Sequence, residues 1–276
     1  MNDARALPLQ QHPLFAGALR RLGRKVTETP MANAAPLISV QVMGQRLASR
    51  GPVWDNGAEI RSKIAALRLS DMRLINAETP QDAVFHTAGF RKLTTQAHAA
   101  ELNLCASEAM REAAMGSKWR NRWRRAQEAP FAIDQSQFNA TKHQWLMEAV
   151  LAQQKQQRFR SLPQTLLKAI ATHEPQSVTV FTASDAGIPR AAMLFVQHWP
   201  VVTYHLGWLC PKARKWSLHH HILMQAAEEF ARAGYKRLDL GGVDTEQAPG
   251  LARFKIGSGA RVRPLGGTWL RLGRIK

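Results

Sequence analysis

The chain has 276 residues, enough for one large domain or two domains of ordinary size, and 45% of them are hydrophobic. Lysine and arginine number 38 against 20 aspartate and glutamate residues, which gives a formal net charge of +18. This excess favours an acidic partner such as nucleic acid, a nucleotide or anionic lipid, although a basic surface that only maintains solubility gives the same count.

Two classes of protein are excluded by these counts. Cys105 and Cys210 are isolated from each other, so neither a disulfide framework nor a zinc-binding spacing is expected. No apolar run approaches the ~18 residues that a membrane-spanning helix needs. The N-terminal MNDARALPLQ lacks the apolar stretch of a secretory signal, so a cytoplasmic location is expected.

The first 90 residues alternate between helical and strand patterns. Phe15, Leu19 and Leu22 recur at helical spacing with cations between them, which predicts a short amphipathic helix. The segment LISVQV predicts a strand followed by a turn at Gly44. The complete prediction for this region is helices at 13–25, 57–68 and 80–88, and strands at 38–43 and 72–77.

A nine-residue pattern occurs twice, as FHTAGFRKL at 85–93 and FARAGYKRL at 230–238. Gly89 and Gly234 suit the left-handed position that ends a helix. Such an ending brings the aromatic residue after each glycine against the phenylalanine that opens the pattern. Each unit therefore predicts a helix, a glycine stop and a strand, and the repetition raises the hypothesis of two related domains.

The second half of the chain has a more regular order. The residues at 185–187, DAG, predict a hairpin turn, and Ser217 is a candidate N-cap for a helix at 217–233. An antiparallel meander followed by a helix and a strand resembles the order of the GNAT acyltransferase core. The strands predicted here are 177–184, 190–198, 201–208 and 236–243.

A basic segment lies between the two halves, at 107–129. Ser107 can cap it, and Trp119 and Trp123 lie four residues apart on one helical face. We expect one long helix that joins the domains, with its tryptophans packed in the core rather than stacked on nucleic-acid bases. The cations of its second half are Lys118, Arg120, Arg122, Arg124 and Arg125.

The C-terminal segment 237–260, RLDLGGVDTEQAPGLARFKIGSGA, resembles the end of the Fem-type aminoacyl transferases. Those proteins have a strand, a Gly-Gly pair, a loop and a Phe-Lys-x-Gly-x-Gly block, which falls on 254–259 here. The segment 100–127 resembles the same family in its alternating leucines, its helix and its basic element. The order of elements extends the likeness along the whole chain.

This resemblance implies an α/β (α+β) fold of two GNAT-like domains, each with a mixed, mostly antiparallel sheet flanked by helices. The expected division is an N-terminal domain at 1–105, a basic linking helix at 106–130 and a catalytic domain at 131–276. The best-known members of the family move an amino acid from aminoacyl-tRNA onto an amine of a peptidoglycan precursor.

Lys255 lies in the Phe-Lys block, and the resemblance implies that it stabilises the oxyanion formed when the acyl ester is attacked. A cation held by aromatic packing beside glycines is preorganised for developing negative charge, an effect of roughly 3–4 kcal/mol for one donor. Strand alternation would turn Phe254 into the core and Lys255 to the opposite face. The alternative is a solvated lysine at a strand edge.

Further candidates lie on the predicted helix and strands before this block. Asp239 and one histidine of the run 219–221, either His220 or His221, are candidate general bases. Adjacent helical residues point about 100° apart, so the run cannot hold one metal ion, and no metal site is predicted. The catalytic candidates are Lys255, Phe254, Asp239 and His220; the substrate-binding candidates are Arg253, Gly241, Gly242, Tyr204, His205 and Trp208.

A pyrophosphate loop of the GNAT type should fall at 209–217, where LCPKARKWS contains no glycine. A backbone cradle for phosphate needs glycines at a helix N-terminus, so coenzyme A is disfavoured without being excluded. No tightly bound cofactor is expected, and the donor is aminoacyl-tRNA or acyl-CoA. The phosphate-binding candidates are Lys118, Arg120, Arg124, Lys212 and Arg214.

The expected function is transfer of an aminoacyl or acyl group to an amine of an anionic small-molecule or peptide acceptor. Contact with tRNA and with a membrane surface fits the charge, and no DNA binding is predicted. Two alternatives stay open: a CoA-dependent GNAT N-acetyltransferase, and a non-catalytic RNA- or membrane-binding protein on a transferase fold. Measured affinity for acetyl-CoA separates the first from the leading hypothesis, and loss of activity on substitution of Lys255 excludes the second.

Overall fold

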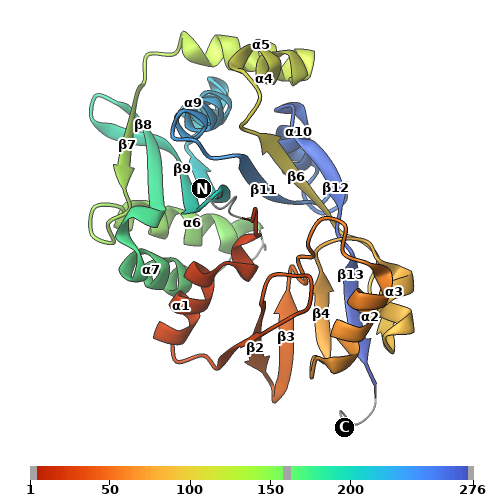
Figure 1. Ribbon diagram of the computed structural model, residues 1–276. Coiled ribbons are helices and arrows are strands. Elements are labelled where there is room, and N and C mark those ends of the chain that lie inside the picture. The colour runs from red at the N-terminus through yellow and green to blue at the C-terminus, as the bar shows by residue number, and fades with distance from the viewer. Residues whose placement is uncertain (1–4, 158–162, 273–276) are drawn as a thin grey trace. The chain divides into compact units, whose positions relative to one another are not determined.

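The computed structural model describes residues 5–157 and 163–272 and divides into two compact units, each with its own sheet (Figure 1). Unit 1 comprises Met1–Ala6 and Ala100–Val262, and unit 2 comprises Leu7–Ala99 and Arg263–Lys276. The division differs from the expected one in two respects. The basic segment lies inside unit 1 instead of joining two domains, and the C-terminal strand returns to unit 2.

Unit 1 is built on a seven-stranded mixed sheet. In spatial order its strands are β12 (Arg261–Pro264), β6 (His98–Asn103), β11 (Arg237–Val243), β10 (Val201–Leu209), β9 (Ile188–His198), β8 (Val178–Asp185) and β7 (Ala132–Gln137). Its helices are α4 (Glu108–Ala114), α5 (Ser117–Gln127), α6 (Gln144–Gln157), α7 (Gln164–His173), α8 (Pro211–Lys215), α9 (Leu218–Arg232) and α10 (Pro249–Gly257), with a 3-10 turn η2 (Pro175–Ser177).

The predicted meander is confirmed as β8, β9 and β10, paired antiparallel. Ala186 and Gly187 turn the first hairpin with φ of 48° and 78°. One face of the meander packs on α9, where the ring of Phe230 lies 5.9 Å from that of Phe181 and 5.4 Å from that of Phe195. Figure 1 shows α6 and α7 on the other side of these strands, the side to which alternation turns their remaining buried residues.

The helix expected at 217–233 is confirmed as α9, but its start differs from the prediction. Ser217 has a left-handed φ of 56° and its side chain makes no capping hydrogen bond. The end of the helix is as predicted: Gly234 has φ 88°, and the Tyr235 N–H donates to the Phe230 carbonyl at 3.0 Å. This 6→1 bond satisfies a carbonyl that the helix would otherwise leave unpaired.

The single basic helix expected at 107–129 is wrong, because the chain forms two helices, α4 and α5. Ser107 caps α4 as predicted, accepting from the Met110 N–H at 3.3 Å. The break falls at Met115, which is buried, and at Gly116, whose N–H donates to the Gly257 carbonyl at 3.0 Å. The helix therefore stops where its backbone meets the end of α10.

Unit 2 has a six-stranded sheet covered by short helices. Its core centres on Trp269, which is fully buried and stacks on Phe85 with ring centroids 4.9 Å apart. In spatial order the strands are β1 (Val26–Thr29), β2 (Leu37–Val42), β3 (Gln45–Ser49), β4 (Leu74–Ala77), β13 (Gly267–Arg271) and β5 (Phe90–Lys92). The helices are η1 (Leu9–Gln11), α1 (Pro13–Arg21), α2 (Ile60–Leu69) and α3 (Asp82–Thr87).

The repeated nine-residue pattern marks two similar helix endings at positions that are not equivalent. Gly89 ends α3 with φ 91°, and Phe85 and Phe90 meet at 5.7 Å, as predicted. However, α9 joins the parallel neighbours β10 and β11, whereas α3 joins β4 and β5, which are separated by β13. The counterpart of α9 in unit 2 is α2, which joins the parallel neighbours β3 and β4. The repeated order of elements is therefore real, but this sequence match does not mark it.

Two smaller expectations concern the thiols and the membrane. Cys105 is exposed and Cys210 is half-buried, and both are free cysteines. Within the ranges that the structure describes, no helix combines the length and apolar character needed to cross a bilayer.

Candidate active site

The centre of unit 1 is the point where β10 and β11 part. The two strands pair in parallel over three residues each, from Val201–Arg237 to Thr203–Asp239. Immediately after this, β10 shifts its register against β9 between Tyr204 and Leu206, which leaves an irregularity at His205. Such irregularities bend a strand and turn its side chains, so β10 and β11 continue in different directions from the same place.

Lys255 lies at this place, but on a helix and not on the expected strand. It belongs to α10, and its side chain is 5% exposed. Its Nζ donates to the Gly242 carbonyl on β11 at 2.7 Å. Burial lowers the pKa of Lys255 to about 8, and the Asp239 carboxylate opposes that shift. Helical geometry, not strand alternation, directs this ammonium group towards β11.

Asp239 shapes the backbone that receives the lysine. It is 2% exposed, and its Oδ1 accepts from the Gly241 N–H at 2.7 Å. Gly241 has φ 77°, a left-handed conformation that glycine adopts readily. A Cβ on Gly241 would lie 3.8 Å from the Lys255 Nζ, so the ammonium packs directly over this turn.

Aromatic residues fix α10 in position. The Trp119 Nε1–H donates to the Phe254 carbonyl at 2.9 Å, so the basic helix α5 is bonded to the residue before Lys255. The ring of His220 lies 4.6 Å from that of Trp119 and 5.2 Å from that of Phe254. Gly257 completes this contact, because a Cβ there would lie 2.6 Å from the Trp119 ring. The two glycines of the Phe-Lys block therefore serve packing at Gly257 and a left-handed turn at Gly259, with φ 86°.

Replacing Gly257 with alanine should destabilise unit 1 by about 1–3 kcal/mol, because the new methyl group overlaps the Trp119 ring. Gly250 in the same helix is a matched control, since a Cβ there meets no atom within 4 Å. Gly250→Ala should leave the melting temperature unchanged or raise it. Thermal unfolding followed by circular dichroism compares the two variants, and equal melting temperatures would contradict the packing role.

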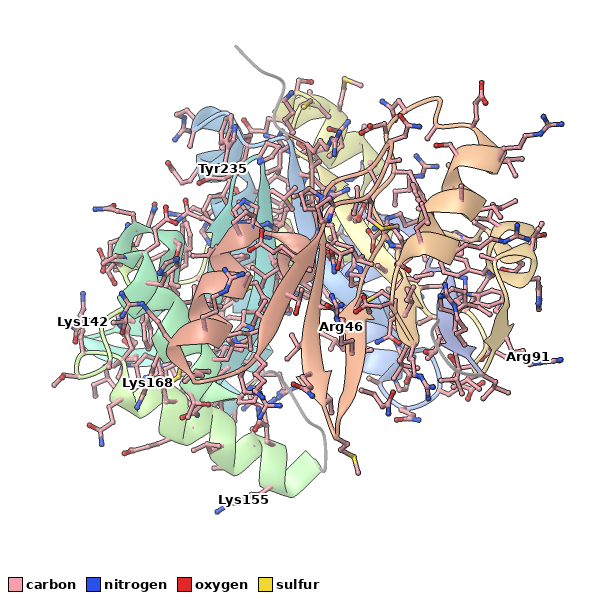
Figure 2. All side chains as sticks on the ribbon, turned by 60° about the horizontal axis from the view of Figure 1, so that its bottom comes forward. Arg46, Arg91, Lys142, Lys155, Lys168 and Tyr235 are labelled. Carbon is pink, nitrogen blue, oxygen red and sulfur yellow. The ribbon has the colours of Figure 1, made fainter. Side chains whose placement is uncertain are left out.

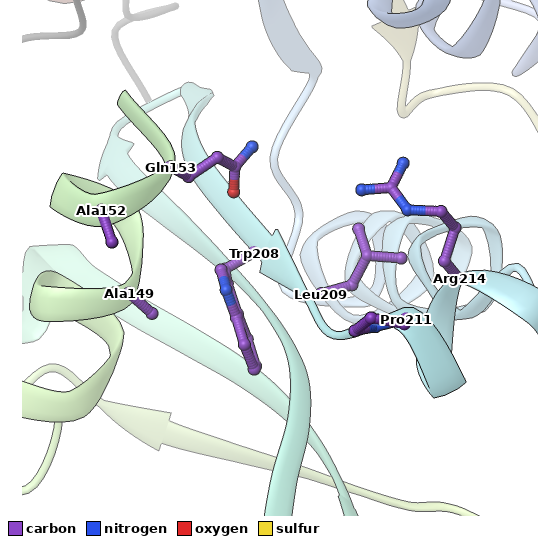
Figure 3. A pocket seen from close by; sticks show the side chains of 7 residues that line it. All are labelled: Ala149, Ala152, Gln153, Trp208, Leu209, Pro211 and Arg214. Carbon is purple, nitrogen blue, oxygen red and sulfur yellow. The ribbon is translucent and has the colours of Figure 1, made fainter. Parts of the chain in front are cut away.

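A pocket of about 310 Å³ lies beside β10. Figure 3 shows Gln153 from α6 and Arg214 from α8 extending towards each other above the Trp208 side chain of β10. Trp208 is held by the ring of Trp145 at 5.6 Å and by His219, whose Nε2 lies 3.0 Å from the Trp208 carbonyl. The pocket thus combines an aromatic wall, an amide and a guanidinium. The other lining residues are Ala149, Ala152, Leu209 and Pro211.

The family model described as "Acetyltransferase (GNAT) domain" matches residues 113–255, just over half of the chain. The chain belongs to the GNAT acetyltransferase-domain family. Its activity class is acyl transfer, and the matched segment runs from within α4 to Lys255. It contains the pocket, Trp119, Asp239 and Lys255, whereas Gly257 and Gly259 lie just beyond it. None of the curated proteins matches the sequence.

Solved structures show how far this GNAT fold extends. A structure of FemX has a TM-score of 0.70 and 12% identity, with 95% of this chain and 93% of that chain covered. The C-terminal domain of a lysylphosphatidylglycerol synthetase from Agrobacterium fabrum has a TM-score of 0.61, 15% identity and coverage of 96% and 89%. L-PGS from Bacillus licheniformis has a TM-score of 0.60, 14% identity and coverage of 96% and 91%. The expected fold of two GNAT-like domains is confirmed over nearly the whole chain.

Three histidines of the GNAT domain are neutral at pH 7 because they are buried. Burial lowers the pKa of His205, His219 and His220 to about 4 each. The Nδ1 of His220 lies 3.1 Å from the Ser217 carbonyl, and that of His221 lies 3.2 Å from the Ala126 carbonyl. Among the described residues, no group of three His, Cys, Asp or Glu side chains could hold a metal ion.

The phosphate-binding candidates lie on two different helices of the domain. On α5, Lys118 is exposed, Arg120 donates to the Met115 carbonyl at 3.1 Å, and Arg124 pairs with Glu112 at 2.7 Å. On α8, Lys212 is paired with Asp185, and Arg214 lines the pocket. Trp119 is 6% exposed, and Trp123 packs against the core of unit 1, which confirms that the tryptophans of α5 are packed residues.

The substrate-binding candidates lie in different parts of the domain. Gly241 and Gly242 lie beside Lys255, and Trp208 lines the pocket, whereas Arg253 is exposed on α10. Tyr204 turns its hydroxyl towards Gly207, where a Cβ would lie 2.6 Å from it. Sequence reasoning missed Gln153 and the α6 side of the pocket. The signal available was the spacing of Ala149, Ala152 and Gln153, which places them on one helical face.

Proposed function

We propose that the protein transfers an aminoacyl group onto an amine of an anionic acceptor, with the Lys255 ammonium stabilising the oxyanion. The observation that carries this proposal is a buried lysine whose Nζ bonds to the Gly242 carbonyl where β10 and β11 part. Lysine is among the residues that proteins almost never bury without a partner. Burying the Lys255 ammonium group costs stability, and a catalytic role for its charge explains why the protein has it at this position.

The chemistry follows from the geometry of this ammonium group. One of its three protons is committed to Gly242, which leaves two for a substrate oxygen. In a low-dielectric setting a fixed donor interacts more strongly with a developing negative charge than water does, and it needs no reorganisation during the reaction. As the amine attacks the acyl carbonyl, the carbonyl oxygen gains charge, and the lysine favours that state over the ground state.

The neighbouring residues have positioning roles in this proposal. Asp239 favours the charged form of Lys255 and holds the Gly241 turn against it. Phe254 is fixed through its carbonyl by Trp119, which sets the rotation of α10 and thereby the direction of the lysine. His220 packs between these two rings, so we assign it a packing role in place of the base role expected from the sequence.

The donor is argued from the segment between β10 and α9. A coenzyme A pyrophosphate needs free backbone N–H groups at a helix N-terminus. Here the Ala213 N–H bonds to the Cys210 Sγ at 3.5 Å, and the Arg214, Ser217 and His220 N–H groups bond to chain carbonyls. The segment fits coenzyme A poorly, so we propose aminoacyl-tRNA as the donor, as the resemblance to Fem-type transferases implies. Trp208 and Arg214 offer its 3′ end a stacking surface and a phosphate contact.

The test supplies aminoacyl-tRNA and acetyl-CoA in separate assays with a panel of anionic amines, and measures deacylated tRNA or free thiol. Acceptor-dependent deacylation of tRNA is expected. Arg214→Gln should raise the KM for the donor about tenfold with little change in kcat, because a phosphate contact contributes to binding in ground and transition states alike.

Lys215, the next residue on α8 and also exposed, is the matched control, and Lys215→Gln should leave both constants unchanged. Turnover with acetyl-CoA alone would instead assign a CoA-dependent N-acetyltransferase. Absence of transfer from either donor to the whole panel would favour the non-catalytic alternative.

A further inference from the structure

The β2–β3 hairpin of unit 2 ends in a turn whose composition is unfavourable for folding. Val42 pairs with Gln45, so the loop consists of Met43 and Gly44, with φ of 47° and 75°. Two-residue turns with positive φ at both positions favour Asn-Gly or Asp-Gly, because a larger side chain is strained in the left-handed region. Figure 2 shows β2 and β3 running side by side to this turn, with Arg46 labelled on the hairpin.

Met43 is also 97% exposed, the highest value among the exposed large hydrophobic residues that the structure describes. Its neighbour Val42 is 38% exposed. An apolar side chain that contacts little of its own chain, in a backbone conformation that disfavours it, violates two rules of folding at one position. Such conflicts are expected where a residue serves a function outside the fold.

Two cations lie beside the strand that leads to this apolar tip. The Gln41 N–H donates to the Lys25 carbonyl at 3.0 Å, and the register of β1 and β2 then brings Arg24 beside Val42. The segment that follows α1, from Leu22 to Lys25, is exposed throughout. We define the hairpin-tip surface as Arg24, Lys25, Val42 and Met43.

We propose that the hairpin-tip surface binds the surface of an anionic phospholipid bilayer. Met43 and Val42 would enter the boundary between headgroups and acyl chains, while Arg24 and Lys25 contact the phosphates. The argument rests on charge complementarity and on the exposed apolar tip, since basic residues beside an apolar insertion combine the two attractions that hold proteins at anionic membranes. This proposal is independent of the transferase activity, and its failure would leave that activity untouched.

The test measures co-sedimentation with phosphatidylcholine vesicles prepared with and without phosphatidylglycerol. Met43→Asn should lower the affinity for phosphatidylglycerol vesicles about tenfold, because it removes the inserted side chain. The melting temperature should stay the same or rise, since asparagine suits the left-handed turn. Arg24→Gln with Lys25→Gln should weaken binding and reduce its dependence on salt.

Leu69, which is 88% exposed at the end of α2, is the control for a general loss of apolar surface, and Leu69→Asn should bind as the wild type does. Undiminished binding by Met43→Asn would overturn the proposal, because adsorption would then follow from the net charge of +18 alone. Equal losses in Met43→Asn and Leu69→Asn would overturn it as well. Loss of RNA binding without loss of vesicle binding in Met43→Asn would assign the surface to nucleic acid instead.

Discussion

Lys255→Met is expected to lower kcat by about 10²-fold or more, with little change in the KM for either substrate. Methionine keeps the length of the buried stem but removes the ammonium group that bonds to Gly242. If that charge stabilises the oxyanion, the loss lies in the transition state and appears in kcat. Steady-state kinetics with the donor and acceptor identified by the transfer assay give the two constants separately.

Lys168→Met is the control, because Lys168 is an exposed lysine on α7 whose loss should leave turnover intact. A Lys255→Met enzyme with wild-type kcat would reject the catalytic role. A raised KM at constant kcat would show that the lysine holds a phosphate of the substrate.

The activity should also fall as the pH rises above about 8, where Lys255 loses its proton. Asp239→Asn should move that fall to lower pH, since Asp239 raises the pKa of the lysine.

The second large effect concerns stability. A lysine of pKa about 8 in the folded protein and 10.5 as its ordinary value binds fewer protons folded than unfolded between these pH values. Unfolding free energy therefore rises with pH across this window, by about 3 kcal/mol in total for this one group. Below pH 8 the penalty of burying the charge is fully present, and above pH 10.5 it is absent.

The difference in unfolding free energy between wild type and Lys255→Met isolates this contribution, because the other titrating groups are common to both. We expect the difference to shift in favour of the wild type by about 3 kcal/mol from pH 8 to pH 10.5. At neutral pH the difference also includes the free-energy cost of the Gly242 carbonyl, which loses its hydrogen bond when Lys255 is replaced by methionine. Denaturant titrations at several pH values measure it, with Lys168→Met as an exposed lysine expected to give a flat difference. A flat line for Lys255→Met would show that the buried lysine titrates normally.

Sequence patterns predicted the strands of unit 1 better than the conformation around Lys255. The strands of unit 1 from β8 to β11 could be predicted because alternation, a DAG turn and a glycine stop each have a local signature. The Phe-Lys block could be located by resemblance, but its conformation could not. PGLARFKIG is short and contains two glycines, and the hydrogen bond that holds α10 in place joins Phe254 to Trp119, 135 residues away in the chain.

The same limit explains the break between α4 and α5. The segment at 107–129 contains strong helix formers and one glycine, and local propensity alone favours continuity. The helix stops because Gly116 bonds to Gly257 and Met115 enters the core. The pocket could not be predicted for a related reason. Gln153 on α6 lines it together with Trp208 and Arg214, which are distant in the sequence, and no sequence motif indicates that these residues lie close together.

The position of β13 has a consequence for the order in which the two units fold during translation. This strand lies between β4 and β5 and carries Trp269 into the centre of the smaller core. On the ribosome, residues 7–99 emerge first but cannot complete their sheet until residues 267–271 have left the exit tunnel. Residues 100–262, although made later, contain every strand of their own sheet except the ends of β6 and β12. The half that is translated first is therefore completed last, and the edges of β4 and β5 that β13 will cover stay unpaired and open to aggregation in the meantime.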